Sequence, residues 1–541
     1  MLTQIANEDS RLSFWLRVRE FAVPASMIET ATARRRVGDW AGACAAAGVD
    51  VDLDLRTVAR TYGRVFVSRL RADLRHLAPD LLRWHLPRIA PDGLLRPGVT
   101  VSLARYDIPG REDTRWPVHL VVRTPPAWAD AGQRVSLALW DADGPVAADR
   151  RHPHPRPDRR FRLDLHRHLW DARRTEELRV RCGADRRPGD DLSGDGPSGD
   201  GPSGDGLLAE GPPGDDPPGD DRPVRDPAVL DPAVLDPAVL DPAVLDPAVL
   251  DPSLLEMSAG GGELPVLGCA VDRWVAEAGI VLRAEGRTTG PVLVRLGSGR
   301  RLVLDPAGGP DGRPALRRAA GCVSALPVLP DAATWVLPDL ELIRTGAVEA
   351  GRLRLHPLVA SALVPDHVVP EDVVPERVPP DHLGAAYAAP GPGGLPDRAG
   401  RARFVECRGA THRIGLVGGV LAPLDHDPDE IRREELLAAL TGTPLPCLQA
   451  IDRAHRRPDC LVGVRERLVH GDVAGALAVV EGLLGPEAVL RDGALRDELE
   501  AAARRRITYG LFRAGLIGPG PGQDRRRPGH LRAHPRHGIP R

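Results

Sequence analysis

Apolar residues recur at helical spacing from the start of the chain to about residue 89. The pattern predicts a short first helix, a second over 24–37 and a third over 40–47. A longer amphipathic stretch follows, in which four leucines mark one face. Pro79 lies inside this stretch, so the helix should kink or divide there. The opening of the chain is therefore predicted to be a helical unit.

The apolar period then changes from helical spacing to alternation. Such alternation between Pro, Gly and Asp turns is typical of short strands, and five strands would form a small antiparallel sandwich or barrel. The five predicted strands cover 99–103, 119–123, 135–139, 161–165 and 178–180.

A second β-rich region is predicted further along. Its clearest feature is a hairpin of 292–296 and 300–304 around Gly297-Ser-Gly299. Further apolar runs could complete a sheet, at 279–282, 322–329, 340–343 and 353–358. Near the C-terminal end, strand-like 404–407 and a hairpin turning at Gly418-Gly419 precede helices that begin at Pro428 and continue to about Leu516.

Short repeats separate these regions. Asp226-Pro-Ala-Val-Leu230 occurs five times in succession and Asp251-Pro-Ser-Leu-Leu255 follows. A proline at every fifth position prevents a helix or a sheet from propagating. Between Cys182 and Ser258 there are 18 acidic residues against 4 arginines. This segment is therefore predicted to be an extended, acidic, disordered linker.

The sequence thus predicts an α+β multidomain protein. Helical N-terminal and C-terminal units flank two small antiparallel β modules, and disordered Pro/Gly/Asp-rich linkers join them. The predicted units are a helical unit (1–92), a β-sandwich or barrel-like module (93–184), an acidic repeat linker (185–262), a second β-rich module (263–365), a Pro-rich linker (366–400), a β-hairpin (401–427), a helical unit (428–518) and a disordered basic tail (519–541).

One eight-residue pattern occurs twice. Gly38-Asp-Trp-Ala-Gly-Ala-Cys-Ala45 and Gly471-Asp-Val-Ala-Gly-Ala-Leu-Ala478 share six residues. In each, glycine should end one helix and aspartate should cap the next. The pattern resembles the turn of a tetratricopeptide-type helical hairpin. Two ordinary helical hairpins and a peptide-binding helical surface are both compatible with it.

Composition excludes several classes of enzyme. The chain has 541 residues and no lysine, so all 72 of its basic side chains are arginine. P-loop phosphate binding, protein-kinase catalysis and Schiff-base chemistry each need a lysine amine. Seven scattered cysteines, with no CxxC pair, and a polar N-terminus without a signal pattern indicate a soluble, cytoplasmic protein.

Two sets of residues could carry chemistry. His152 and His154, like His166 and His168, are spaced two apart, and four imidazoles could bind Zn²⁺ or Cu²⁺. No carboxylate or cysteine completes a familiar metal-binding spacing. Asp425-His426-Asp427 precedes a helix and Cys447, Asp452 and His455 follow, a set that could support acyl transfer if the fold assembled it.

Structural interpretations compete with both sets. Cys447 lies in the rigid apolar stretch Pro444-Leu-Pro-Cys-Leu448, which is typical of a buried thiol, and the aspartates suit helix caps. We therefore assign no catalytic, cofactor-binding or metal-binding residue and expect no cofactor.

Several segments resemble known sequences. His412-Arg-Ile-Gly-Leu-Val417, Pro423-Leu-Asp-His426, Glu430-Ile-Arg-Arg-Glu-Glu435 and Pro446 to Asp452, with Ser26 to Thr30, are similar to uncharacterised proteins of GC-rich actinobacteria. The resemblance suggests a gene neighbourhood with MoxR-type AAA ATPases and implies no activity.

We predict a non-catalytic cytoplasmic interaction or adaptor protein with a protein partner, for which an AAA ATPase is a candidate. A metal-dependent or cysteine-based hydrolase is the alternative. No run of residues has the length of an apolar membrane span, so we expect no membrane association. The basic tail from Arg525 to Arg541 lacks aromatic residues, which disfavours nucleic-acid binding. The sequence does not indicate the oligomeric state.

The linker assignment makes a testable prediction. Deletion of residues 226–255 should leave the melting temperature of the full chain unchanged, because an extended acidic segment contributes no packed core. Differential scanning calorimetry of the two proteins would measure this. A large fall in melting temperature would contradict the linker assignment.

Overall fold

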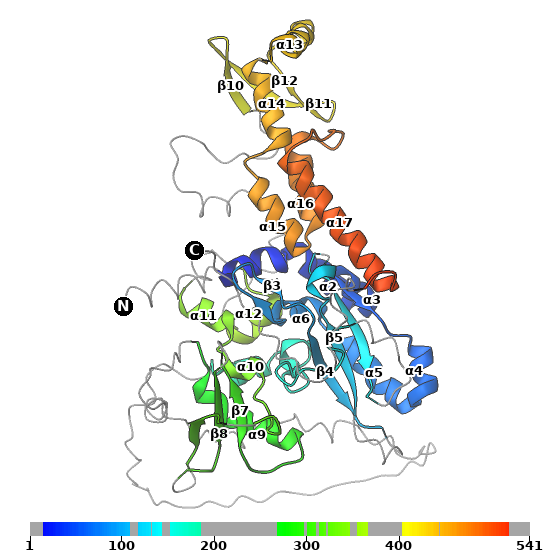
Figure 1. The fold of residues 1–541 in the computed structure, drawn as a ribbon, viewed down its shortest axis with the longest axis vertical. Helices are drawn as coiled ribbons and strands as arrows, with labels where there is room; N and C mark the ends of the chain where they lie inside the picture. Colours follow the sequence, from blue (N-terminus) through cyan, green and yellow to red (C-terminus); the bar gives the residue numbers. More distant parts are fainter. Residues whose placement is uncertain are drawn as a thin grey trace, which may run out of the picture.

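The computed structural model contains both helices and small antiparallel sheets, and the fold is α+β (Figure 1). It describes residues 14–108, 117–130, 132–142, 152–184, 268–296, 300–309, 313–320, 323–346, 354–365, 403–442 and 444–518. The linkers predicted at 185–262 and 366–400 and the tail predicted at 519–541 lie outside these residues. We call the described part up to residue 365 the body and residues 403–518 the arm.

The first segment of the body is helical, as its apolar pattern predicts. Its elements are the π-helical turn η1 (Val18–Ala22) and the helices α2 (Ala25–Arg36), α3 (Trp40–Ala46), α4 (Leu55–Tyr62), α5 (Arg64–His76) and α6 (Pro79–His85). Pro79 begins α6 instead of continuing α5, because a proline fits the first turn of a helix and has no N–H to donate. The predicted division of the leucine-bearing stretch is confirmed.

A four-stranded sheet packs against these helices. Its strands are β1 (Val49–Val51), β4 (Thr100–Tyr106), β5 (Val118–Arg123) and β6 (Val135–Trp140), in the order β1-β6-β5-β4. The last three confirm predicted strands and pair antiparallel. β1 comes from the helical segment and pairs parallel with β6, a contact that no local pattern predicts.

Two predicted strands of this region are wrong. Residues 161–165 form only an isolated bridge, between Ser102 and Arg162. Residues 178–180 lie in helix α7 (Glu177–Cys182), which ends at Gly183 in the left-handed conformation. Leu178 is the single fully buried residue of that helix, and so short an apolar run cannot distinguish a strand from a helical turn.

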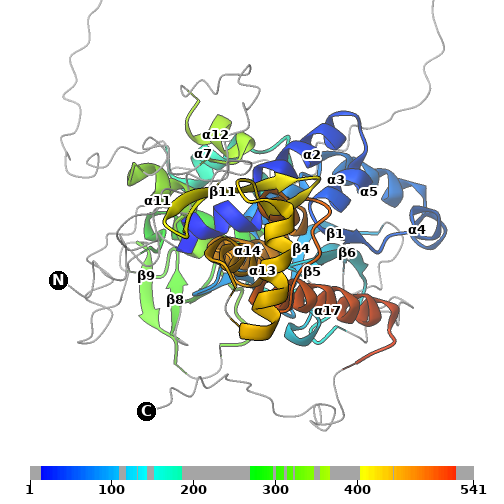
Figure 2. The same cartoon turned by 90° about the horizontal axis from the view of Figure 1, so that it is seen from above.

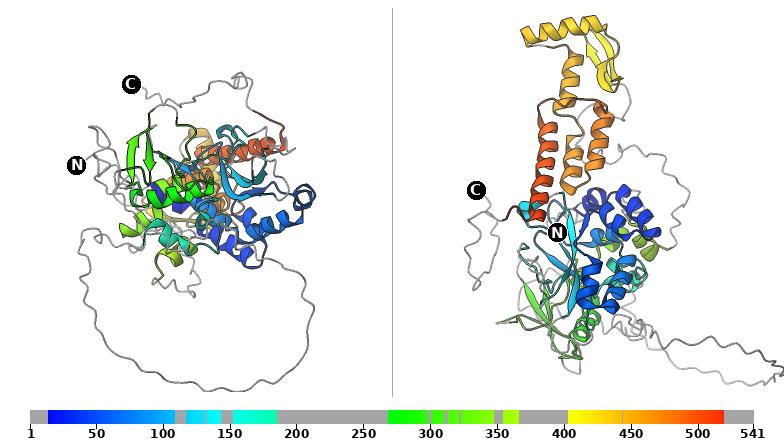
Figure 3. Two further views of the ribbon diagram at one scale, coloured as in Figure 1. Left: turned by 90° about the horizontal axis from the view of Figure 1, so that it is seen from below. Right: turned by 90° about the vertical axis from the view of Figure 1, so that its right-hand side faces the viewer.

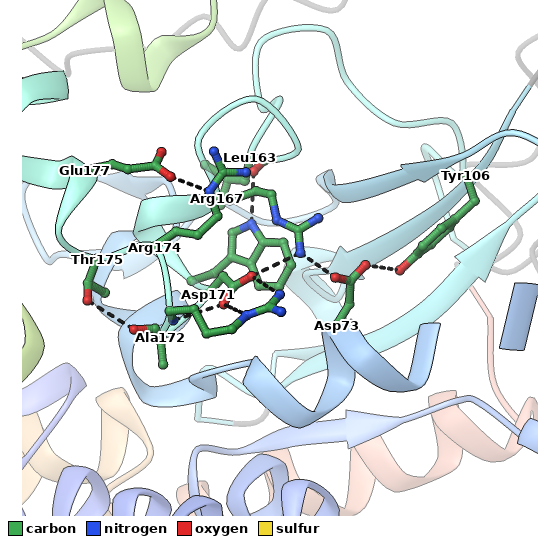
Figure 4. A network of polar contacts seen from close by, with 11 residues as sticks. Asp73, Tyr106, Leu163, Arg167, Asp171, Ala172, Arg174, Thr175 and Glu177 are labelled. Atoms are coloured by element: carbon green, nitrogen blue, oxygen red, sulfur yellow. Dashed lines mark hydrogen bonds and ion pairs between the residues drawn. The ribbon is translucent and has the colours of Figure 1, made fainter. Parts of the chain in front are cut away.

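One hydrophobic core crosses the predicted boundary at residue 92. It contains fully buried leucines from the helices and from the strands. A polar network joins the same elements (Figure 4). The Tyr106 hydroxyl donates to Asp73 Oδ2 at 2.6 Å, and Arg167 binds both Asp73 and Asp171. Segments predicted as separate units therefore share their interior.

The remaining short elements of the first part of the body connect these layers. They are β2 (Arg88–Ile89), β3 (Leu94–Leu95), η2 (Ala127–Ala129) and η4 (Arg167–Leu169).

The second part of the body has its own core. This core is formed by η8 (Val271–Arg273), α9 (Trp274–Ala284), the antiparallel strands β7 (Val292–Arg295), β8 (Arg301–Asp305) and β9 (Ala315–Arg318), and α10 (Asp331–Thr334). The helices α11 (Pro338–Arg344) and α12 (Pro357–Leu363) follow, and α12 packs on the core of the first part through Val359 and Leu363. The β7–β8 pair confirms the predicted hairpin. Strand β9 was not predicted.

Four other predictions of strands in this part are wrong. Residues 279–282 belong to α9, which is apolar on several sides because most of its length is buried. Residues 340–343 belong to α11, and the described residues 354–358 of the other run lead into α12, which begins at Pro357. Prolines at the first turns of α11 and α12 favour helix in both places. Within 322–329 the described residues contribute only an isolated bridge to β7.

The arm extends away from the body (Figures 1 and 3). It begins with the antiparallel strands β10 (Arg403–Cys407), β11 (Ala410–Val417) and β12 (Val420–Pro423) and continues with α13 (Pro428–Thr441), α14 (Pro446–Arg456), α15 (Leu461–His470), α16 (Val473–Leu484) and α17 (Ala494–Ala514). The predicted hairpin at Gly418-Gly419 and the helices from Pro428 are confirmed. Viewed along the arm, α13 and α14 lie over the middle of the body (Figure 2).

The two copies of the eight-residue pattern have the same local structure. Asp39 caps α3 by accepting the Gly42 N–H at 2.8 Å, and Asp472 caps α16 by accepting the Gly475 N–H at 2.9 Å. A Cβ on either of these glycines would overlap the capping carboxylate. The shared Asp and Gly are therefore explained by one helix-start geometry.

Arg83 joins the arm to two chain segments of the first part of the body. Its side chain is buried, and its three nitrogens donate to three backbone carbonyls: those of Ala22, Gln133 and His470. Burial lowers the pKa of Arg83 to about 10, so the guanidinium remains charged at neutral pH. One guanidinium thus provides hydrogen bonds to backbone carbonyls of three segments that are far apart in sequence.

The arm and the body also touch through glycines and aromatic rings. Gly471, at φ 91°, lies so close to Gly132 that a Cβ on Gly471 would overlap the Gly132 carbonyl. The rings of Trp128 and Phe512 meet edge to face with centroids 5.4 Å apart. A close backbone contact with a positive φ requires glycine at position 471.

Replacing Arg83 should destabilise the protein strongly. Arg83→Leu leaves three buried carbonyls without their donors, which we expect to cost about 3 kcal/mol or more. Arg34→Leu is the matched control: Arg34 makes an exposed ion pair with Asp39, and its loss should cost less than about 1 kcal/mol. Urea denaturation followed by circular dichroism would measure both. Equal effects would contradict the role assigned to Arg83.

His470, at the same junction, should make the protein sensitive to acid. Burial, together with the positive charges of the nearby Arg88 and Arg83, lowers the pKa of His470 to about 3. Glu466 lies 3.8 Å from its Nε2 but is itself paired with Arg17. The unfolded chain takes up this proton near pH 6.5, so stability should fall as the pH drops below 6.5, by at most about 1.4 kcal/mol per pH unit.

The variant His470→Phe tests this. Phenylalanine can keep the stacking on Phe21 but cannot be protonated, so the variant should lose less stability than the wild type between pH 6 and pH 4. His154→Phe, at an exposed site, should retain the acid sensitivity of the wild type. Thermal unfolding across this pH range would measure the difference, and identical slopes for all three proteins would refute the prediction.

Candidate functional site

The first histidine pair is held by backbone hydrogen bonds. His152 is buried, its Nε2 lies 2.9 Å from the Thr124 carbonyl, and its Nδ1 accepts the His154 N–H. Burial lowers the pKa of His152, and both ring nitrogens already have partners. This arrangement suits a structural histidine that anchors the loop after the sheet.

The second pair has different partners. His166 Nδ1 lies 3.1 Å from the Arg162 carbonyl, and its Nε2 lies 3.2 Å from Glu277. The rings of His166 and His168 are 5.7 Å apart, and burial lowers the pKa of His168 well below its ordinary value. Within the described residues, the four histidines of the two pairs do not form a metal-binding group.

The predicted Cys447, Asp452 and His455 all lie on α14 but do not form a catalytic set. Asp452 is paired with Arg456 and Arg491. Burial, together with the contact with Cys407, raises the pKa of the Cys447 thiol to about 11. A thiol with a raised pKa is a poor nucleophile at neutral pH, so the site lacks an activated cysteine.

The structure instead brings Cys447 together with two other side chains. One ligand atom each from Cys407, His426 and Cys447 lies within 4.8 Å of the other two. Cys407 ends β10, His426 precedes α13 and Cys447 lies in the first turn of α14. We call these three residues the Cys-His cluster. It is the only such group of three or more His, Cys, Asp or Glu among the residues that the structure describes.

His412 lies directly beside the Cys-His cluster. Its ring stacks on that of His426, with centroids 4.1 Å apart and an angle of 30° between the planes. Strand register explains its position: His412 pairs with Val405, two residues before Cys407, so the side chains of His412 and Cys407 share one face of the sheet. That face packs on α14.

The sequence analysis placed His426 and Cys447 in one candidate set, as parts of an acyl-transfer site, but it did not connect Cys407 or His412 with them. The hairpin turn at Arg408-Gly409, where both residues have positive φ, was the available signal. It would have placed Cys407 and His412 on adjacent strands. The approach of Cys447 depends on how α14 packs on the sheet, which no local pattern indicates.

A cleft of about 550 Å³ lies between the sheet of the body and the end of α17. Its walls include Arg123, His152, Tyr509 and Phe512. Tyr509 donates to Asp50, and Arg513 is paired with Asp52. These two contacts attach the arm to the body along the cleft.

Large apolar side chains are exposed mainly on the arm. Among the described residues three lie on the body, namely Val37, Val65 and Val180. The arm carries Phe404, Leu416, Val417, Val420, Leu424, Leu436, Leu437, Leu440, Val462, Leu477, Val489, Ile507, Leu511 and Leu516. The first eight lie at the end of the arm far from the body, on the sheet, on α13 and between them, and we call them the distal apolar surface (Figure 1).

Helix α13 has no buried residue, and Leu440 is 86% exposed. An isolated helix in water gains little from its apolar side chains, so such a face is typical of a surface that another protein covers. None of the described helices is long and apolar enough to span a membrane.

Comparison with protein-family models, with curated proteins and with solved structures finds no match to this chain.

Proposed function

We propose that this chain is a non-catalytic interaction or adaptor protein, and that the distal apolar surface binds a protein partner. The observation that carries the proposal is the concentration of exposed apolar side chains at the end of the arm, on α13 and on the neighbouring sheet. Clusters of this kind on otherwise polar surfaces mark sites of protein association.

The geometry of the arm supports this function. The arm holds its distal end away from the body, where a partner can approach without meeting the β modules (Figures 1 and 3). The face of α13 presents Leu436, Leu437 and Leu440, an arrangement that suits an apolar groove on a partner. An AAA ATPase remains the partner class that the sequence resemblance suggests, and regulation of such an ATPase is part of the proposal.

The alternative, a metal-dependent or cysteine-based hydrolase, has less support. The Cys447 side chain is fully buried, and the carboxylate nearest to it on α14, that of Asp452, is occupied by two arginines. The histidine pairs of the body are held by backbone and carboxylate contacts. A hydrolase would need an accessible nucleophile or an open metal position.

The proposal predicts that polar substitutions on α13 abolish binding without unfolding the chain. Leu437→Ser with Leu440→Ser should leave the stability within about 0.5 kcal/mol of the wild type, because both side chains are exposed. Tagged full-length protein from the native host should yield a stoichiometric partner with the wild type and not with this variant. Ile507→Ser, at an exposed apolar position of α17, is the matched control and should retain the partner.

Several outcomes would contradict the proposal. One is a partner that the α13 variant still binds fully. Another is a dimer of this chain that the α13 variant dissociates, which would show that the surface pairs two copies. Failure of His152→Ala or His455→Ala to complement a strain lacking the protein, with folding intact, would favour the hydrolase.

A further inference from the structure

The Cys-His cluster contains polar atoms that nothing else in the described structure satisfies. The His426 side chain is 2% exposed, and its Nε2 has no hydrogen-bond partner; neither has His412 Nδ1. The His426 Nδ1 faces the Glu430 carboxylate at 3.5 Å, so the ring proton belongs on Nδ1 and the lone pair of Nε2 is left to bind a metal ion. Burying polar groups without hydrogen-bond partners costs folding free energy, so these atoms indicate that an ion or molecule binds in the cluster.

The ligand atoms of the cluster indicate which ion would bind there. Two thiols and imidazole nitrogens are the ligands that Zn²⁺ prefers, whereas Mg²⁺ and Ca²⁺ require oxygen. Bound to one tetrahedral ion, these atoms would be about 3.3–3.8 Å apart. The ligand atoms of Cys407, His426 and Cys447 lie within 4.8 Å of one another, so these three need only a contraction of roughly 1 Å to reach that geometry. His412, whose ring stacks on that of His426, lies outside this group and would move closer to complete it.

The local fold also fits a structural ion. The distal part of the arm is a three-stranded sheet packed on α14. Its buried apolar residues other than cysteine are Ile414, Leu421, Leu445, Ile451 and Ala454, which continue into the core of the rest of the arm. Few apolar side chains thus lie beneath the sheet itself, and a metal or a disulfide commonly supplements so small a core. An ion here would link β10, the segment before α13 and the start of α14.

We propose that Cys407, His426 and Cys447 bind one zinc ion as a structural site, with His412 as the fourth ligand. Binding displaces the thiol protons of Cys407 and Cys447 to solvent, and both cysteines then coordinate as thiolates. No electron is transferred. Four protein ligands close the coordination sphere, so the site holds the end of the arm together and leaves no position for a substrate. The inference does not depend on the proposed function.

The test begins with metal content. Full-length protein purified under reducing conditions without chelator should contain about one zinc per chain by inductively coupled plasma mass spectrometry. Cys407→Ser and Cys447→Ser should each reduce this to background. Cys460→Ser and His455→Asn, in the same arm but outside the cluster, are matched controls and should retain the metal.

Cobalt provides a readout that does not depend on the variants folding. Wild-type protein stripped of metal should bind Co²⁺ with intense visible d–d bands and a thiolate-to-cobalt charge-transfer band. A strong chelator should lower the melting temperature of the wild type, and added Zn²⁺ should restore it. In His412→Phe, which keeps the ring stacking, we expect Co²⁺ affinity to fall roughly tenfold or more.

Two results would overturn the site. One is protein that is free of zinc and takes up neither Zn²⁺ nor Co²⁺ with thiolate coordination. The other is a disulfide between Cys407 and Cys447 in protein alkylated at lysis, shown by mass spectrometry of the linked peptides. Undiminished Co²⁺ affinity in His412→Phe would overturn the four-ligand form.

Discussion

One buried guanidinium, that of Arg83, holds three segments of the arm and the body together. Arg83 has no carboxylate among its hydrogen-bond acceptors, and its planar fork binds the carbonyls of Ala22, Gln133 and His470 instead. Removing such a charge from water is costly, and only several well-directed acceptors offset the cost. The three carbonyls must therefore stay where they are, which fixes the end of η1, the loop before β6 and the end of α15 relative to one another.

Other buried polar pairs extend this principle through the body. Arg19 binds Asp339 at 2.9 Å and joins η1 to α11, and Arg181 binds Glu277 with two bonds of 2.8 Å and joins α7 to α9. Apolar contacts are tolerant of small displacements, whereas a two-bond pair permits one geometry. In a chain without lysine, arginine makes both of these connections, and its fixed fork specifies which elements pack together. The two parts of the body are joined in this way.

Local signals in the sequence predicted local structure. The helix caps at Asp39 and Asp472, the division at Pro79 and the β7–β8 hairpin depend on neighbours within a few residues, and the structure has all of them. Predictions failed where a segment of three or four residues with few apolar positions had to be assigned without context, as at 178–180 and 279–282. Whether such a segment becomes helix or strand depends on how it packs in the folded chain, which a local sequence pattern does not indicate.

The candidate site, too, depends on tertiary packing that local sequence patterns do not indicate. Each residue of the Cys-His cluster is unremarkable in its own segment, and Cys447 in particular resembled an ordinary buried thiol. The cluster exists because the sheet packs on α14, which brings together residues forty positions apart.

A metal ion in the Cys-His cluster would support the proposed role of the distal apolar surface, which lies at the same end of the arm. A surface that binds a partner loses less conformational entropy on association if its backbone is already ordered. The apolar core beneath the distal apolar surface is small, and α13 contributes no buried residue to it. In the proposed zinc site, the thiols of Cys407 and Cys447 and the imidazoles next to α13 would add directional bonds to this end of the arm, beside the ladder of the sheet.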